Sequence, residues 1–364
     1  MTKDYRHFGW ECSPYSSKTR AYFRFKGIPH EDIYPNIIQL KRVVEKRVGF
    51  IVMPTVITPE NQMLQDSSEI IDILEKRHPE PNIRPPGPCL QMASLLLELF
   101  ADEWMPIISM HTRWNLPENT NFAKTDFGFN AVPWLPAFVR KQVGGVLAKK
   151  MQGYLPILGI TPKTQPAIET WMNELFDALD AHLQKYMYLF GGRPCLGDFA
   201  LYGPIFAHVR RDPGSRHQIT SRTHLNAWVL RLRNPTGVHG EFMMDDEVPA
   251  TLDSVFRRLF LEQFPLLHET VARVSQWRQE HPDEVRFPRS LGDVEFKLGD
   301  VSETRRLTTF PLWMFQRPLG YYRSISSEER SGVDAFLRRV GGYEAMQIEL
   351  PLRLTRKNFR VVVA

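Results

Sequence analysis

A serine between an expected strand and an expected helix is the residue of this chain best placed to do chemistry. Residues 10–20 read WECSPYSSKTR, and the apolar spacing after Pro14 predicts a helix that ends at Gly27. The first turn of such a helix presents unpaired backbone N–H groups that carry a partial positive charge. Ser13 is therefore placed to donate a hydrogen bond to an anion, a thiolate above all. The alternative is that Ser13 only caps the helix.

Two later segments add groups suited to binding. Residues 52–57 (VMPTVI) are rich in β-formers and contain Pro54, which fits the start of a strand and a cis Met53–Pro54 bond. Residues 62–74 predict a short strand and then a helix that opens at Asp66 and Ser67. A polar helix start of this kind suits a carboxylate ligand. The alternative is that these two residues merely cap their helix.

These three segments resemble the motifs of the glutathione transferases, whose N-terminal domain is thioredoxin-like. Residues 13–20 resemble the active-site turn of the serine and cysteine classes. Residues 53–56 resemble the cis-proline segment that binds the cysteinyl backbone of glutathione, and residues 64–70 the acidic and serine pair that holds its γ-glutamyl end. The resemblance gives Ser13 the catalytic role. It assigns glutathione binding to Val52, Met53, Pro54, Asp66 and Ser67.

The resemblance extends to about Pro235 and predicts the organisation of the chain. Residues 1–79 are expected to form an α/β thioredoxin-like glutathione-binding domain, followed by a proline-rich linker over residues 80–90. Residues 91–235 are expected to form an all-α domain with the acceptor site. Residues 236–364 lie beyond the resemblance, and their pattern predicts an extension of helices plus a hairpin that packs on the helical domain.

Two segments of the helical part call for separate predictions. Residues 116–151 are rich in Phe, Trp, Pro and Gly, and we expect them to break the helical pattern and form a lid or a wall of an apolar pocket. Residues 193–201 resemble the capping box of the buried helix of transferases, with Cys195 at the cap where Ser or Thr is usual. Asp198 is then a folding residue, because it can accept from the backbone N–H of the cap.

Composition excludes several classes of protein. The 364 residues are 43% hydrophobic and 24% charged, as in a globular protein, and the three cysteines are too scattered for a disulfide framework. No apolar run reaches membrane-spanning length and no secretory signal opens the chain, so we expect a cytoplasmic protein with no membrane partner. The 46 basic residues are interspersed with 41 acidic ones, and no nucleic-acid motif appears, so no nucleic acid is expected.

The predicted function is a glutathione transferase that activates the glutathione thiol for attack on a small apolar electrophile. Lowering a thiol pKa by about two units requires about 2.7 kcal/mol. A hydrogen bond to a charged partner contributes about 1.5–3 kcal/mol and a helix N-terminus about 0.3–1 kcal/mol. Ser13 and its helix therefore suffice without a metal, and the 11 histidines show no metal-ligand spacing. Glutathione is the expected co-substrate, and the family expectation is a homodimer.

Other functions stay open. Cys12 suggests a glutathione-dependent thiol oxidoreductase or lyase, although related enzymes of that kind carry their cysteine at the position of Ser13. A non-enzymatic binding protein could keep the same fold. The polar and aromatic segment of residues 111–114 (HTRW) fits a surface or interdomain role better than the second substrate site.

Overall fold

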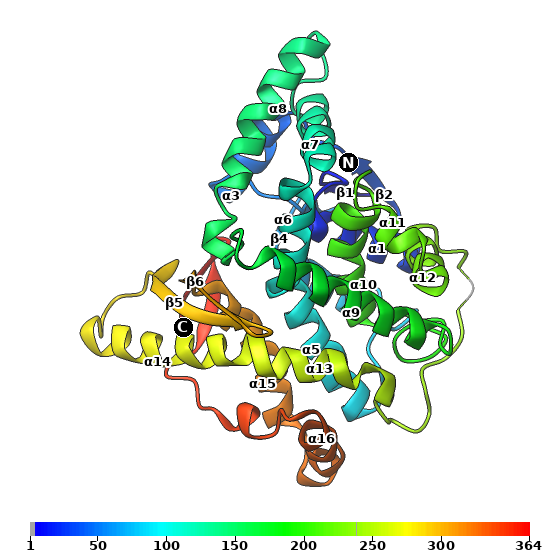
Figure 1. Ribbon diagram of the computed structural model, residues 1–364, viewed down its shortest axis with the longest axis vertical. Coiled ribbons are helices and arrows are strands. Elements are labelled where there is room, and N and C mark those ends of the chain that lie inside the picture. Colours follow the sequence, from blue (N-terminus) through cyan, green and yellow to red (C-terminus); the bar gives the residue numbers. More distant parts are fainter. Residues whose placement is uncertain (1–3, 238) are drawn as a thin grey trace.

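A four-stranded sheet organises the N-terminal part of the chain in the computed structural model, which describes residues 4–237 and 239–364 (Figure 1). The strand order is β2-β1-β3-β4, with β1 and β2 parallel and the other neighbours antiparallel. The strands are β1 (Tyr5–Phe8), β2 (His30–Ile33), β3 (Thr55–Ile57) and β4 (Met63–Gln65). This mixed sheet confirms the predicted thioredoxin-like arrangement.

Helices connect and cover this sheet. They are α1 (Pro14–Lys26), α2 (Ile37–Gln39), the π-helix η1 (Leu40–Glu45), α3 (Lys46–Val48) and α4 (Ser67–Arg77). As predicted, α1 begins at Pro14, whose fixed φ suits a first helical position. It ends at Gly27, which has a φ of 63° and can adopt this left-handed conformation without a Cβ clash.

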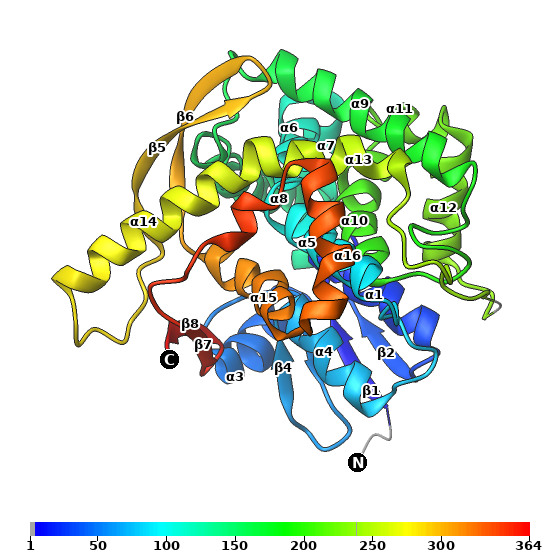
Figure 2. The same cartoon turned by 90° about the horizontal axis from the view of Figure 1, so that it is seen from below.

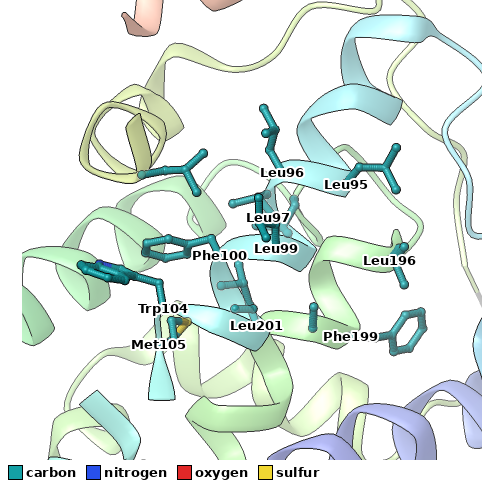
Figure 3. Packing of buried hydrophobic residues seen from close by; sticks show 14 of the residues in the cluster. Leu95, Leu96, Leu97, Leu99, Phe100, Trp104, Met105, Leu196, Phe199 and Leu201 are labelled. Carbon is teal, nitrogen blue, oxygen red and sulfur yellow. The ribbon is translucent and has the colours of Figure 1, made fainter. Parts of the chain in front are cut away.

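A helical domain follows, with α5 at its centre. Its helices are α5 (Pro88–Glu103), α6 (Pro106–Asn115), α7 (Pro117–Ala131), α8 (Ala137–Gln152), η2 (Pro156–Leu158), α9 (Gln165–Leu183), α10 (Leu196–Pro204), η3 (Ile205–Arg210), α11 (His217–Thr220) and α12 (Thr223–Arg233). Nearly every side chain of α5 is buried, and its leucines and Phe100 belong to the same hydrophobic cluster as Leu196, Phe199 and Leu201 of α10 (Figure 3). A helix that is buried on nearly all sides belongs in the middle of a core, and two of its buried carboxylates, Glu98 and Asp102, are paired with cations there.

Residues 116–151 form regular helices, so the prediction that they break the helical pattern is wrong. They make the antiparallel pair α7 and α8. A Cβ at Gly128 would overlap the carbonyl oxygen of Arg140, and one at Gly144 would overlap that of Lys124. These glycines therefore permit close contact between the two helices. In the sequence, the same glycines suggested an irregular segment.

Asp198 has the structural role predicted for it. Its Oδ2 accepts from the backbone N–H of Cys195 at 2.9 Å. Its Oδ1 accepts from Leu189 N at 3.1 Å and from Trp228 Nε1 at 2.8 Å. The carboxylate thus ties the start of α10 to a loop and to α12, and it forms a capping box together with the side chain of Cys195.

The C-terminal extension contains the expected helices and hairpin, and a second hairpin ends the chain. Its elements are η4 (Ala250–Leu252), α13 (Asp253–Arg258), η5 (Leu259–Gln263), α14 (Phe264–Glu280), β5 (Ser290–Leu298), β6 (Val301–Thr308), α15 (Phe310–Ser324), α16 (Ser327–Val340), η6 (Glu344–Gln347), β7 (Leu354–Lys357) and β8 (Arg360–Val363). Both α15 and α16 pack on α5, as the predicted contact with the helical domain requires (Figure 2).

The extension also reaches the N-terminal domain, which the sequence did not predict. Arg317 of α15 pairs with Asp72 of α4, and its Nε lies 2.9 Å from Glu98 Oε2 in α5. Lys18 of α1 meets the same carboxylate, with its Nζ 2.8 Å from Glu98 Oε1 and 2.6 Å from Asp102 Oδ2. One buried carboxylate therefore joins all three parts of the chain.

Candidate active site

Ser13 occupies the N-cap of α1. Its backbone is extended, with φ −90° and ψ 121°, and its Oγ accepts from the backbone N–H of Ser16 at 3.3 Å. The side chain is half-buried. Capping uses a lone pair of the hydroxyl and leaves its hydrogen available, so the capping role and donation to an anion are compatible.

Tyr15, the other exposed hydroxyl residue of this turn, is already engaged. The residue is 36% exposed, but its hydroxyl donates to the carbonyl oxygen of Asp102 at 3.0 Å. Burial of the hydroxyl raises the pKa of Tyr15 well above its usual range, and nearby carboxylates add to the effect: Glu103, Asp102 and Asp66. Tyr15 therefore stays protonated, and Ser13 is the better candidate to meet an anion.

The thiol of Cys12 faces the protein core. The residue is 4% exposed and belongs to a cluster with Trp10 and Trp114. Burial, with a smaller contribution from Asp126, raises the pKa of Cys12 to about 12. The thiol is therefore protonated at neutral pH, which is the opposite of a reactive cysteine.

A buried arginine from the helical domain holds the turn in front of α1. Arg113 Nη1 donates to the carbonyl oxygen of Cys12 at 2.8 Å, and His208 Nε2 lies 3.2 Å from the same oxygen. Arg113 also pairs with Asp212, with Nε 2.7 Å from Oδ2 and Nη2 2.7 Å from Oδ1. The interdomain role expected for residues 111–114 is thus observed for Arg113. His208 and Asp212 were not predicted, because about 100 residues separate them from Arg113.

The cis-proline segment lies at the same end of the sheet as the turn with Ser13. The Met53–Pro54 peptide bond is cis, as expected. Pro54 is buried, whereas Val52 and Met53 are half-buried. Strand β3 starts directly after this segment, at Thr55.

Asp66 is the N-cap of α4. Its Oδ1 accepts from the backbone N–H groups of Ser68 at 3.0 Å and Glu69 at 3.1 Å, and its own φ is 82°. Ser67 follows at the first position of the helix and is buried. The capping role of Asp66 is therefore present, and its second oxygen remains for another partner.

A single row of the sheet brings the three segments together. Phe8 is paired with Thr55, and Thr55 is paired with Gln65 on its other side. Phe8 is the end of the strand that leads to Ser13, Thr55 follows Pro54, and Gln65 precedes Asp66. The segments that carry the predicted binding and catalytic residues therefore meet the sheet at the same end of its strands.

The second oxygen of Asp66 faces an arginine from the far end of the chain. Arg356 Nη1 lies 3.4 Å from Asp66 Oδ2 and 3.2 Å from Glu69 Oε2. Its Nη2 donates to the side-chain oxygen of Gln65 and, at 3.0 Å, to the carbonyl oxygen of Phe359. Sequence reasoning missed this contact, because 290 residues separate Arg356 from Asp66 and no local pattern marks it.

Two family models match the chain. Residues 8–82 match the N-terminal domain of glutathione S-transferases, and residues 150–235 match the C-terminal domain. These two stretches of the chain therefore carry the N-terminal and C-terminal domains of the glutathione S-transferases. A search of curated proteins finds no match.

Solved glutathione S-transferases resemble this transferase-like chain at low identity. One from Methylobacterium radiotolerans, in complex with glutathione sulfonate, is 19% identical with a TM-score of 0.41, over 68% of this chain and 95% of that one. A Tau class enzyme from mango is 14% identical with a TM-score of 0.40, over 69% and 95%. None of the helices within residues 4–237 and 239–364 is long and apolar enough to cross a membrane.

Proposed function

We propose that this protein is a glutathione transferase that activates the thiol of glutathione for attack on a small apolar electrophile. The observation that supports the proposal most is the pairing of Phe8, Thr55 and Gln65 across three neighbouring strands. This pairing brings the three predicted motifs to one end of the strands. The two family matches support it independently.

Each part of glutathione has a complementary group in this proposal. The hydroxyl of Ser13 donates to the thiolate, helped by the N-terminus of α1. The backbone of Val52 and Met53, before Pro54, binds the cysteinyl part. Asp66 pairs with the ammonium of the glutamyl end, and Ser67 donates to its carboxylate.

The stabilisation required for this chemistry is available locally. Bringing a thiol pKa of about 8.5 to about 6.5 requires about 2.7 kcal/mol. A hydrogen bond to an ionised group supplies about 1.5–3 kcal/mol and a helix N-terminus about 0.3–1 kcal/mol. Attack by the thiolate on an aryl halide then forms the carbon–sulfur bond and releases halide ion. Attack on an epoxide breaks a carbon–oxygen bond, and the resulting alkoxide takes a proton from water. No protein cysteine takes part in either reaction.

The alternative of an oxidoreductase or lyase acting through Cys12 is less favoured. Its thiol is buried and its pKa is raised to about 12, so little thiolate is present at neutral pH. A binding protein without activity would share the same glutathione contacts and differ only in turnover. Assembly as a homodimer, a cytoplasmic location and the domain boundaries given above stay predictions.

Calorimetric titration with glutathione, followed by conjugation assays with aryl halides and epoxides, tests the proposal. We expect Ser67→Ala to weaken glutathione binding about tenfold, as for one lost charge-assisted hydrogen bond. Ser327→Ala is the matched control, because Ser327 holds the same first position in α16 and is exposed. Equal glutathione affinity in both variants and the wild type would contradict the assignment of Ser67. Binding without any conjugation would favour the binding protein.

A further inference from the structure

We infer that the C-terminal hairpin β7–β8 occupies the glutamyl part of the proposed glutathione site, so that glutathione must displace Arg356 to bind. This inference rests on the function proposed above. The hairpin would then act as an internal competitor that is part of the same chain.

The contested atom is Oδ2 of Asp66. Oδ1 of this carboxylate already accepts two backbone N–H groups at the start of α4. Oδ2 is thus the oxygen suited to the ammonium of glutathione, and Arg356 Nη1 lies 3.4 Å from it. The guanidinium lies next to this oxygen and repels a second cation, so an ammonium that binds Oδ2 competes with Arg356 for it.

The contact between Arg356 and Asp66 is largely buried and is supported by further hydrogen bonds, unlike a typical surface ion pair. The side chain of Arg356 is only 6% exposed, and its guanidinium also meets Glu69, Gln65 and the carbonyl oxygen of Phe359. These partners use most of the donors that an arginine has. Burying the guanidinium of Arg356 costs free energy, and these hydrogen bonds and ion pairs offset that cost. Exposed surface pairs do not have this set of partners.

The hairpin also packs near the second part of the proposed site. Phe359 in its turn is half-buried and packs against the same hydrophobic cluster as Val52 and Met53. Arg360 stacks over the ring of Phe50, with its guanidinium carbon 5.0 Å from the ring centre. The hairpin therefore packs on the hydrophobic cluster that also contacts the segment predicted to bind the cysteinyl part, while its Arg356 reaches Asp66.

The hairpin is attached in a way that allows it to leave as a unit. Among residues 4–237 and 239–364, its two strands form a separate two-stranded sheet, and an isolated two-stranded hairpin is marginally stable in water. At its base, Leu354 exchanges hydrogen bonds with the side chain of Gln316 at 2.7 and 3.1 Å. Near its end, Val363 N donates to Val285 O at 3.1 Å. The apparent affinity for glutathione is then reduced by the fraction of molecules in which the hairpin is closed.

Calorimetric titration with glutathione separates the outcomes. We expect Arg356→Ala, and a chain that ends at residue 352, to bind glutathione about tenfold more tightly than the wild type. Lys357→Ala is the matched control, because this neighbouring cation is exposed, and its affinity should be unchanged. Equal or weaker binding by Arg356→Ala, with the wild type binding glutathione, would overturn the inference while the proposed function stands.

Hydrogen exchange of the hairpin amides provides a second readout. Asp66→Asn keeps the helix cap but removes the charge, so residues 354–363 should exchange faster than in the wild type without any ligand. Asp177→Asn, an exposed pair with Arg222, is the control and should leave this exchange unchanged. Glutathione added to the wild type should also accelerate it, and unchanged exchange with glutathione bound would overturn the inference. Absence of glutathione binding in every variant, the shortened chain included, would overturn both proposals.

Discussion

Replacing Arg113 by Met should destabilise the protein by about 3–5 kcal/mol. The side chain of Arg113 is 2% exposed, and its partner Asp212 is fully buried. Methionine fills a similar volume but leaves the carboxylate of Asp212 without its cation, and breaking a buried pair in this way costs about 3–5 kcal/mol. The carbonyl oxygen of Ala207 also loses its donor, which lies at 2.6 Å. The carbonyl oxygen of Cys12 still has His208 nearby, so that loss is partly compensated.

Urea denaturation of Arg113→Met measures this cost by linear extrapolation. Arg257→Met is the matched control, because Arg257 is 56% exposed and its pair with Asp253 lies within one helix. It should change the free energy of unfolding by less than about 0.5 kcal/mol. In the double variant Arg113→Met with Asp212→Leu, most of the loss should be recovered, because no buried charge is left unpaired.

The pH dependence of the same variant supplies the refutation. Burial raises the pKa of Asp212 even with Arg113 present, and removing the arginine must raise it further. The folded variant then holds a proton that the unfolded chain has released above about pH 3.9, so its deficit relative to wild type should shrink from pH 7 to pH 5. A deficit below about 1 kcal/mol at pH 7, or one that grows on acidification, would refute the reasoning.

Three further predictions concern chemistry and acid stability. Ser13→Ala should keep glutathione affinity but raise the pKa of the bound thiol by about 1–2 units and slow turnover at pH 7; an unchanged thiolate titration, followed by ultraviolet absorbance, would exclude Ser13. Cys12→Ser should keep most conjugation activity, whereas rapid glutathionylation of Cys12 in the wild type, with a disulfide reductase activity that the variant loses, would favour the oxidoreductase. Burial lowers the pKa of His7 and of His182 to about 4. The unfolded chain therefore binds more protons than the folded chain below about pH 6.5, and each histidine should lower the free energy of unfolding by about 2 kcal/mol between pH 7 and pH 5. Urea denaturation at pH 7 and pH 5 tests this, and an unchanged free energy of unfolding would contradict it.

Local signals were sufficient to predict much of the fold. Pro14 and Gly27 mark the ends of α1 through backbone preferences that act within a few residues. Asp66 likewise identified the start of α4, because an N-cap is a short-range hydrogen bond. The same reasoning placed the cis bond before Pro54. Local geometry of this kind is encoded in the few residues that form it.

What could not be predicted depends on distant contacts. Gly128 and Gly144 suggested irregular structure, and only the packing of α7 against α8 explains why glycine is required there. The partners of Arg113 and of Arg356 come from residues about 100 and 290 positions away. The sequence around an arginine does not indicate which distant carboxylate it will contact. The position of the hairpin β7–β8 at the candidate site could therefore not be predicted from the sequence.

The shared carboxylate of Glu98 has a consequence for how the protein is made. During synthesis the chain leaves the ribosome from its N-terminus, so Lys18 reaches Glu98 well before Arg317 has been translated. Until then Glu98 and Asp102 have one cation between them, and the face of α5 that later receives α15 is uncovered. The N-terminal and helical domains can therefore meet early, whereas the ion pairs that join them to α15 form only after Arg317 has been translated.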